Sequence, residues 1–275
     1  MKLLVTGGRG QLGRALVRRG GDAIVACDLP ELDICDGDAV ARALDGCTGV
    51  INAAAYTAVD KAETEREQAY AVNRDGAGNV ARACAVRGIP LVHVSTDYVF
   101  DGTATTPYRE DAPLHPLGVY GESKLAGEEA VREAGGTIVR TSWLFGQGGP
   151  SFVHTMVRLA TERPVLRVVA DQHGCPTWAD DLADALIALV HAPVGTYHFC
   201  NAGPTTWHAF ATAIVAEARK HRTLACERIE PITTAEYPTP AKRPAYSVLD
   251  TSKVQALGIV PPPWTIGLAR VIAEV

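Results

Sequence analysis

The chain has 275 residues, 47% hydrophobic and 21% charged, which is enough to bury a sizeable core in one domain with at most a small lobe. Its formal net charge of -5 gives no electrostatic reason to expect binding to nucleic acid or to an anionic membrane surface. No apolar stretch approaches the ~20 residues of a membrane span, and no signal-peptide pattern precedes the first apolar run. We therefore expect a soluble, cytoplasmic protein.

The cysteines argue against two kinds of scaffold. There are seven of them, an odd number, scattered along the chain and never in C-x-x-C spacing. This pattern fits neither a disulfide framework nor a zinc site, so we expect small buried thiols and no structural metal.

The first half of the chain alternates short apolar runs with segments of helical periodicity. Strands are predicted at 2–6, 23–27, 49–53, 91–95 and 137–141, and helices at 11–19, 36–44, 67–87 and 119–133. Strands alternating with helices predict an α/β protein with a Rossmann-type, doubly wound parallel sheet.

The pattern changes after about residue 146. Isolated strands at 165–169 and 196–200, two helices at 180–191 and 206–221, and proline-rich connections are predicted there. The three prolines of YPTPAKRP at 237–244 exclude a helix interior or a central strand. We expect a dinucleotide-binding core at 1–145, and at 146–275 mainly a smaller substrate-binding lobe with segments that return to the core.

A glycine-rich loop follows the first predicted strand and opens the first predicted helix. Gly7, Gly10 and Gly13 form G-x-x-G-x-x-G, which lets the backbone approach a pyrophosphate held at the helix N-terminus. Asp28 ends the second predicted strand, where an acid usually binds the adenosine ribose and favours NADH. Arg9 could instead meet the 2′-phosphate of NADPH, so both dinucleotides are left open.

Tyr120 and Lys124 lie four residues apart in a predicted helix and therefore share a face. An ammonium beside a phenol favours the tyrosinate, so we expect Lys124 to lower the pKa of Tyr120 toward a range useful for proton transfer. Thr96 follows a predicted strand and emerges at the carboxyl edge of the sheet, where its hydroxyl can bind a substrate carbonyl. Asn73 is either a further cofactor contact or only a polar residue on a helix face.

The glycine triplet, Thr96, Tyr120 and Lys124 occur in the order typical of the extended short-chain dehydrogenase/reductase superfamily, which the chain resembles from end to end. Within it, the chain is similar to the dTDP-4-dehydrorhamnose reductase family through GQLG at 10–13, NAAAYTAVDKAE at 52–63, VSTDYVFDG at 94–102, VYGESKLAGE at 119–128, RTSWLF at 140–145, DQHGCPT at 171–177 and the proline-rich segment.

This resemblance implies roles for individual residues. Thr96 and Asp97 touch the sugar, Tyr120 donates the proton, Lys124 binds the nicotinamide ribose, and Trp143 packs beside the substrate. Dinucleotide contacts are implied for Gln11, Leu12, Asp28, Asp33, Ile34, Ala55, Tyr56 and Thr57.

The implied reaction is reduction of the C4 ketone of dTDP-4-dehydro-L-rhamnose to dTDP-L-rhamnose by NADPH or NADH. Some family members dimerise through Mg²⁺ held partly by an acid two positions past the third glycine. Ala15 occupies that position here, so a bound Mg²⁺ is doubtful, and a monomer and a homodimer through another face are both left open.

Other functions compete with this one. A 4,6-dehydratase would carry Thr-Asp-Glu where this chain has Tyr98 in third place, so water elimination is not expected. A C4-ketoreductase for another dTDP-deoxysugar fits the same motifs. A non-catalytic NADP-binding regulatory subunit, like that of methionine adenosyltransferase, also shares the dinucleotide motifs. Lys242 and Arg243 either bind the substrate diphosphate or lie on a solvated loop, while Trp207 and Phe210 are expected in the core.

Overall fold

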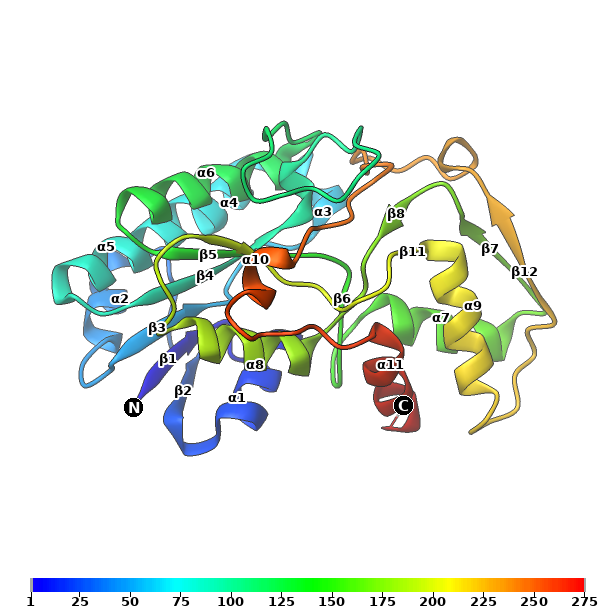
Figure 1. Cartoon of the computed structure of the whole chain (residues 1–275), viewed down its shortest axis with the longest axis horizontal. Helices are drawn as coiled ribbons and strands as arrows, with labels where there is room; N and C mark the ends of the chain where they lie inside the picture. The colour runs from blue at the N-terminus through cyan, green and yellow to red at the C-terminus, as the bar shows by residue number, and fades with distance from the viewer. Residues whose placement is uncertain (1, 275) are drawn as a thin grey trace.

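The computed structural model describes residues 2–274; Met1 and Val275 lie outside the described part. A six-stranded parallel sheet with helices on both faces forms one half of the molecule, and a smaller lobe of short strands and helices forms the other (Figure 1). The strand order is β10-β5-β4-β3-β1-β2, with bounds β1 Leu3–Thr6, β2 Ile24–Cys27, β3 Gly49–Asn52, β4 Leu91–Thr96, β5 Thr137–Thr141 and β10 Thr196–His198. The predicted doubly wound sheet is therefore confirmed.

Two helices cover one face of the sheet. They are α1 (Gln11–Gly20) and α8 (Ala179–Leu189), which pack against each other and against the strands. Leu16 and Leu186 are fully buried with Val5 in one apolar cluster. Because α8 comes from the second half of the chain, part of that half belongs to the core layer.

The opposite face is covered by α2 (Gly37–Ala43), α5 (Ala77–Arg87) and α6 (Val119–Glu133). Leu4 of β1 and Val80 of α5 are buried in the cluster between this layer and the sheet. Side chains alternate between the two faces along each strand, so a polar residue two positions after a core residue faces the same helices.

The helix predicted as one unit at 67–87 is continuous but not regular. It consists of α4 (Arg66–Tyr70), a π-helical stretch at Ala71–Gly76 and then α5. A π-bulge shifts the faces of a helix relative to the turns that follow and is often found at functional sites. Apolar periodicity alone could not reveal this extra residue in the turn.

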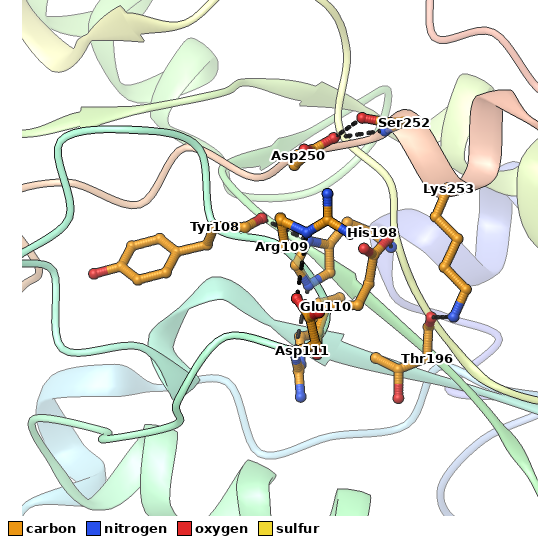
Figure 2. Close-up of polar contacts among 10 residues, drawn as sticks. Tyr108, Arg109, Glu110, Asp111, Thr196, His198, Asp250, Ser252 and Lys253 are labelled. Atoms are coloured by element: carbon orange, nitrogen blue, oxygen red, sulfur yellow. Dashed lines mark hydrogen bonds and ion pairs between the residues drawn. The ribbon is translucent and has the colours of Figure 1, made fainter.

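The strand predicted at 196–200 is not an isolated strand of the lobe. Thr196–His198 pairs in parallel with β5 and adds the sixth strand to the main sheet, so that prediction was wrong about its place. Polar groups cover its outer edge (Figure 2): Glu110 accepts a hydrogen bond from the backbone N–H of His198 at 3.1 Å, and Lys253 donates one to the carbonyl of Thr196 at 2.6 Å. Because these backbone groups of the edge strand are already hydrogen-bonded to side chains, they are not available to pair with a strand of another chain.

The lobe surrounds a second apolar cluster. The strands β7 (Val165–Val169) and β12 (Arg228–Ile232) pair in parallel, and Phe210 of α9 (Trp207–Ala218) is fully buried between them and the neighbouring helices, as predicted. The elements of the lobe and its connections are β6 Leu144–Phe145, α7 Phe152–Glu162, β7 Val165–Val169, β8 His173–Gly174, β9 Thr177–Trp178, β11 Thr205–Thr206, α9 Trp207–Ala218, β12 Arg228–Ile232, α10 Ser252–Gln255 and α11 Trp264–Glu274.

Short helices complete the chain: η1 Gly21–Ala23, α3 Val59–Ala62, η3 Asp97–Val99 and η4 Thr234–Glu236. The proline-rich segment at 237–244 is neither helix nor strand, as its prolines predict. None of the described helices combines the length and the apolar character needed to cross a bilayer.

Candidate active site

A cavity of about 610 Å³ opens at the carboxyl ends of β1, β3, β4 and β5. The connections from β1 and β3 run to opposite sides of the sheet there, which is where open α/β sheets bind ligands. The residues to which the resemblance or the motifs gave a definite role all line this cavity: Gly7, Gly10, Gln11, Leu12, Gly13, Asp28, Asp33, Ile34, Ala55, Tyr56, Thr57, Thr96, Asp97, Tyr120, Lys124 and Trp143. The residues left with two readings, Arg9, Asn73, Lys242 and Arg243, are not in its lining.

The glycine loop forms a cradle without side chains. Gly7 has a φ of +70°, and the N–H of Gly10 donates to its carbonyl at 3.1 Å. A Cβ on Gly13 would lie 2.2 Å from that carbonyl oxygen, so the close turn requires glycine. Because Gly10 offers no side-chain cap, the first N–H groups of α1 are left for an anion such as a pyrophosphate.

Asp28 and Arg9 are tied to the same turn. The carboxylate of Asp28 accepts hydrogen bonds from the backbone N–H groups of Arg9 and Leu29, both at 2.8 Å. The guanidinium of Arg9 binds the carbonyl of Leu29 and, at 2.5 Å, the carboxylate of Glu31. Arg9 is thus an exposed cation that already has an acidic partner. The geometry of this turn does not discriminate between NADH and NADPH.

Asn73 ties the segment after β3 to the helix layer. Its Oδ1 accepts from the backbone N–H of Tyr56 at 2.9 Å, and its Nδ2 donates to the carbonyl of Tyr56 and to Oγ of Ser123 at 3.1 and 3.0 Å. Asn73 lies in the π-helical stretch and is 1% exposed. Its place is therefore behind the cavity wall, where it positions the backbone beside Ala55 and Thr57.

Thr96 and Asp97 lie where β4 ends and η3 begins. The hydroxyl of Thr96 accepts from the N–H of Tyr98 at 3.2 Å and donates to Oδ1 of Asp97 at 3.0 Å. Oδ2 of Asp97 is buried without a hydrogen-bond partner of its own. Burial raises the pKa of Asp97 to about 6, although the hydroxyls of Ser247 and Thr96 act in the opposite direction. A buried carboxylate with a free oxygen is suited to bind a ligand hydroxyl.

Tyr120 lies on the first turn of α6, edge-to-face against Tyr98 with ring centroids 5.5 Å apart. Burial raises the pKa of Tyr120 to about 12; a hydrogen bond with the Thr96 hydroxyl lowers it and the charge of Asp97 raises it. The prediction that Lys124 brings this pKa down is wrong for this arrangement. The phenol keeps its proton at neutral pH, as a proton donor must.

The position of the Lys124 ammonium explains why the pKa of Tyr120 is not lowered. The ammonium is held by residues of β4. Its Nζ donates to the carbonyl of Val94 at 2.6 Å and lies 3.3 Å from Nε2 of His93. Burial lowers the pKa of Lys124 to about 8, partly opposed by the carboxylate of Glu128. An ammonium with a lowered pKa at the wall of a cleft is a common feature of active sites.

A buried ion pair fixes the rest of α6. The carboxylate of Glu128, one turn after Lys124, receives both arms of Arg140 from β5 at 2.9 and 2.7 Å, and the hydroxyl of Ser95 from β4 at 2.6 Å. Both charged side chains are at most 1% exposed. The helix that carries Tyr120 and Lys124 is therefore held in register with the strands that carry Thr96.

Trp143 connects the core to the lobe. It has a φ of +47°, rare for a bulky residue, and its indole stacks on Trp207 with centroids 3.6 Å apart. A Cβ on Gly174 would lie 2.5 Å from the indole, so glycine is required beneath it. Trp207 is only half-buried, which differs from the core position predicted for it.

A second cavity, of about 620 Å³, lies in the lobe beside Trp207. Arg163, Arg167 and Arg243 line it. Arg243 also pairs with Asp60 at 2.8 and 2.9 Å, whereas Lys242 is exposed and outside the lining. The two stacked tryptophans thus stand between a cavity lined by the predicted catalytic residues and one lined by three arginines.

Some lining residues were not found from the sequence. Thr141 ends β5 and Ser142 follows it at the same edge, so both could have been found by the rule that identified Thr96. Gln68 and Val72 come from α4 and the π-helical stretch, and no local pattern marks them.

A glycine cradle after the first strand, with a Tyr-x-x-x-Lys helix and a threonine at the same sheet edge, defines an NAD(P)-dependent reductase of the extended short-chain dehydrogenase type. The model of the RmlD substrate binding domain family matches residues 1–275. The chain belongs to this family, that of the dTDP-4-dehydrorhamnose reductases.

Individual relatives agree over the whole length. The dTDP-4-dehydrorhamnose reductase of Streptomyces griseus is 47% identical over 274 residues, covering 94% of this chain and 88% of that protein. Spore coat polysaccharide biosynthesis protein SpsK of Bacillus subtilis (strain 168) is 42% identical, with 99% and 97% covered. The crystal structure of dTDP-4-dehydrorhamnose reductase from Bacillus anthracis str. Ames in complex with NADP matches with a TM-score of 0.93 and 39% identity, covering 100% of both chains.

Proposed function

We propose that the protein reduces the C4 ketone of dTDP-4-dehydro-L-rhamnose to the alcohol of dTDP-L-rhamnose, with NADPH or NADH as the reductant. The observation that carries this proposal is the gathering of Thr96, Tyr120 and Lys124 around the cavity whose other end is the glycine cradle. The family membership narrows the substrate from ketones in general to a 4-keto nucleotide sugar.

The cradle fits a dinucleotide, since glycines and free helix N–H groups are what a pyrophosphate requires. Gly7, Gly10 and Gly13 would hold the pyrophosphate and Asp28 the adenosine ribose, and Lys124 would bind the nicotinamide ribose. A bound reduced dinucleotide supplies the hydride.

The chain's own groups supply the proton and the electrostatics. Thr96 would donate a hydrogen bond to the C4 oxygen, which stabilises the charge that develops there. Tyr120 would give its proton to that oxygen. Asp97 would accept a hydrogen bond from a sugar hydroxyl.

The second cavity suits the dTDP part of the substrate. The three arginines around about 620 Å³ can donate hydrogen bonds to a diphosphate, although Arg167 also pairs with Glu236 and Arg243 with Asp60. The half-buried indole of Trp207 can contact a base or a sugar. Trp143 would then pack between the reacting sugar and the nucleotide. This arrangement gives Arg243 the substrate role rather than that of a solvated loop cation.

Turnover tests the proposal. Purified protein is mixed with NADPH and dTDP-4-dehydro-L-rhamnose, the absorbance of the reduced nicotinamide is followed, and the product is identified by NMR. Substrate-dependent oxidation with formation of dTDP-L-rhamnose supports it. Tight dinucleotide binding without turnover would instead favour a regulatory subunit like that of methionine adenosyltransferase, and a higher kcat/KM on another dTDP-4-keto-deoxysugar would change the substrate but not the reaction.

A cytoplasmic location and a monomeric or homodimeric state stay predictions from the sequence. Ala15 is fully buried in the cluster between α1 and α8, so it offers no ligand to a bridging Mg²⁺. Sedimentation with and without added Mg²⁺ would test this, and we expect no difference between the two.

A further inference from the structure

A row of buried polar side chains crosses the sheet and ends at Lys124. Thr6, Asn52 and His93 occupy neighbouring register positions on β1, β3 and β4. The hydroxyl of Thr6 lies 2.6 Å from Oδ1 of Asn52, Nδ2 of Asn52 lies 3.0 Å from Nδ1 of His93, and Nε2 of His93 lies 3.3 Å from Nζ of Lys124. All four side chains belong to residues at most 2% exposed.

His93 occupies a position on β4 where an apolar core residue would be expected. Leu91, two positions before His93 on the same face of β4, is buried in the apolar cluster under the helices. Burying an imidazole costs free energy unless its ring nitrogens are hydrogen-bonded, and His93 has a polar contact on each of them. None of the roles proposed above for the cavity residues involves His93.

The hydrogen-bond roles in the row follow from what each group can donate. An ammonium has three donors and no lone pair, so Nε2 of His93 must accept from a charged Lys124. Burial and the nearby ammonium hold the pKa of His93 well below its ordinary value, so the ring is neutral and has one N–H. That N–H must therefore be on Nδ1, and it must donate to Asn52.

Asn52 can accept this hydrogen bond through its carbonyl oxygen. A half-turn of the side-chain amide exchanges Oδ1 and Nδ2 with almost no change in shape, and the hydrogen-bond network decides between the two orientations. With Oδ1 toward His93, the NH₂ group faces the hydroxyl oxygen of Thr6. A charged Lys124 thus requires one tautomer of His93 and one orientation of Asn52.

The surroundings of the ammonium leave one donor for the cavity. One N–H of Lys124 goes to the carbonyl of Val94 and one to His93. The charged group on the same helix is Glu128, which Arg140 of β5 pairs; Tyr120 and Asp97 stand on the cavity side. Thr6 of β1 and Asn52 of β3, the other members of the row, are uncharged. From β4, the ammonium is contacted by the backbone carbonyl of Val94 and by the side chain of His93.

We propose that His93 is a positioning residue of the reductase site: as its Nδ1–H tautomer, fixed by Asn52, it accepts a hydrogen bond from the ammonium of Lys124 and holds the third donor of that ammonium toward the ligand. This inference rests on the proposed role of Lys124 in binding the nicotinamide ribose.

The tautomer can be measured in the unaltered protein. Protein with ¹⁵N-labelled histidine is studied by long-range ¹H–¹⁵N NMR near pH 6.5, and the His93 signal is assigned by its loss in His93→Gln. A protonated Nδ1 and an unprotonated Nε2 are expected. A protonated Nε2, or a ring that exchanges freely between tautomers, would overturn the proposal, and neither outcome depends on turnover.

The pH profile of kcat tests the consequence for Lys124. Reduction needs the charged lysine, so kcat should fall as the pH rises through about 8. His93→Leu removes the acceptor and should move this fall to lower pH by about one unit, since one hydrogen bond to a charged group is worth about that much. His93→Gln can keep an acceptor at the position of Nε2 and should restore the profile.

A merely structural role would give a different result. His198→Leu is the matched control, because His198 is another fully buried histidine; it lies on β10, and its Nδ1 is 3.1 Å from the carbonyl of Tyr108. We expect it to lower the melting temperature without moving the profile. If His93→Leu is folded by circular dichroism and behaves like this control, His93 does not position Lys124.

Discussion

The hydroxyl of Thr96, at the end of a strand, lies close enough to Tyr120, on the first turn of a helix 24 residues later, to act on its phenol and lower its pKa. Both line the same wall of the cavity. A carbonyl oxygen bound there would meet one hydrogen-bond donor from the sheet and one proton donor from α6. The buried pair of Glu128 and Arg140 keeps these two elements in register.

Tyr120→Phe should remove the proton donor and leave the cavity otherwise intact. We expect kcat to fall by the ~10²–10⁴-fold typical of a lost general acid, while the Kd for the dinucleotide stays the same. Tyr70→Phe is a suitable control, because this phenol lies outside the cavity lining and binds Arg66 and Glu122 at the helix surface. An unchanged kcat in Tyr120→Phe would remove this residue from the mechanism.

Asp97 should cost stability at neutral pH. Its pKa in the folded protein is about 6 against an ordinary value of 3.8, so the folded state binds more protons than the unfolded state between these values. The free energy of unfolding therefore falls as the pH rises from about 4 to 6, by about 3 kcal/mol at most.

Asp97→Asn removes this penalty, so urea unfolding should show a gain of about 1–3 kcal/mol at pH 7 and little gain at pH 4. The same variant should lower kcat/KM, because the free oxygen that receives the sugar hydroxyl is replaced or turned. Equal gains at both pH values would mean that the charge of Asp97 is not the cause.

Asp28→Ala should shift the dinucleotide preference toward NADPH. The carboxylate lies where the adenosine ribose is expected and would repel a 2′-phosphate. The change also removes two backbone hydrogen bonds of the turn, at Arg9 and Leu29, so kcat/KM should fall for both dinucleotides. The ratio of kcat/KM for NADPH to that for NADH is the measurement, and a ratio equal to the wild-type value would contradict the role of Asp28.

Glu31→Gln tests the effect of the Arg9 charge on dinucleotide preference separately from the effect of the turn geometry. It weakens the ion pair of Arg9 without touching the backbone contacts of Asp28. Freed from Glu31, the guanidinium can reach a phosphate, so we expect the NADPH to NADH ratio to rise here as well, but without the general loss of kcat/KM.

The pair formed by Glu128 and Arg140 should be strongly coupled. Glu128→Gln leaves a buried guanidinium without its partner and should destabilise the protein by about 3–5 kcal/mol, whereas the double variant with Arg140→Met should recover part of that loss. The exposed pair of Arg158 and Glu162 is the control, and Glu162→Gln should change the free energy of unfolding by less than about 1 kcal/mol. Additive effects of the two core changes in a double-mutant cycle would contradict the coupling.

Much of the sheet and the cavity could be predicted from the sequence, because both depend on local rules. Strand-loop-helix periodicity located β1 to β5, and residues that follow parallel strands must meet at one edge, so Thr96 and the glycine triplet were found together. The resemblance added Trp143 and the contacts near Asp33, which no spacing rule identifies.

What could not be predicted depends on packing between distant segments. The sixth strand joins the sheet only because β5 has a free edge beside it, and a run of three residues carries no sign of its partner. The direction of the Lys124 ammonium is set by Val94 and His93 on another element, so the spacing from Tyr120 gave the right face but the wrong electrostatic effect. The π-helical turn is a further case, since one extra residue hardly alters an apolar pattern.

A structure of the protein with oxidised dinucleotide and dTDP-L-rhamnose would show whether Tyr120 is placed to protonate the C4 oxygen. The decisive quantity is the distance from Oη of Tyr120 to the C4 oxygen of the sugar. We predict hydrogen-bond contact, about 2.6–3.2 Å, with Oγ1 of Thr96 on the same oxygen and Nζ of Lys124 on the nicotinamide ribose. A sugar bound with C4 directed away from Tyr120, or a dinucleotide bound outside the glycine cradle, would contradict it.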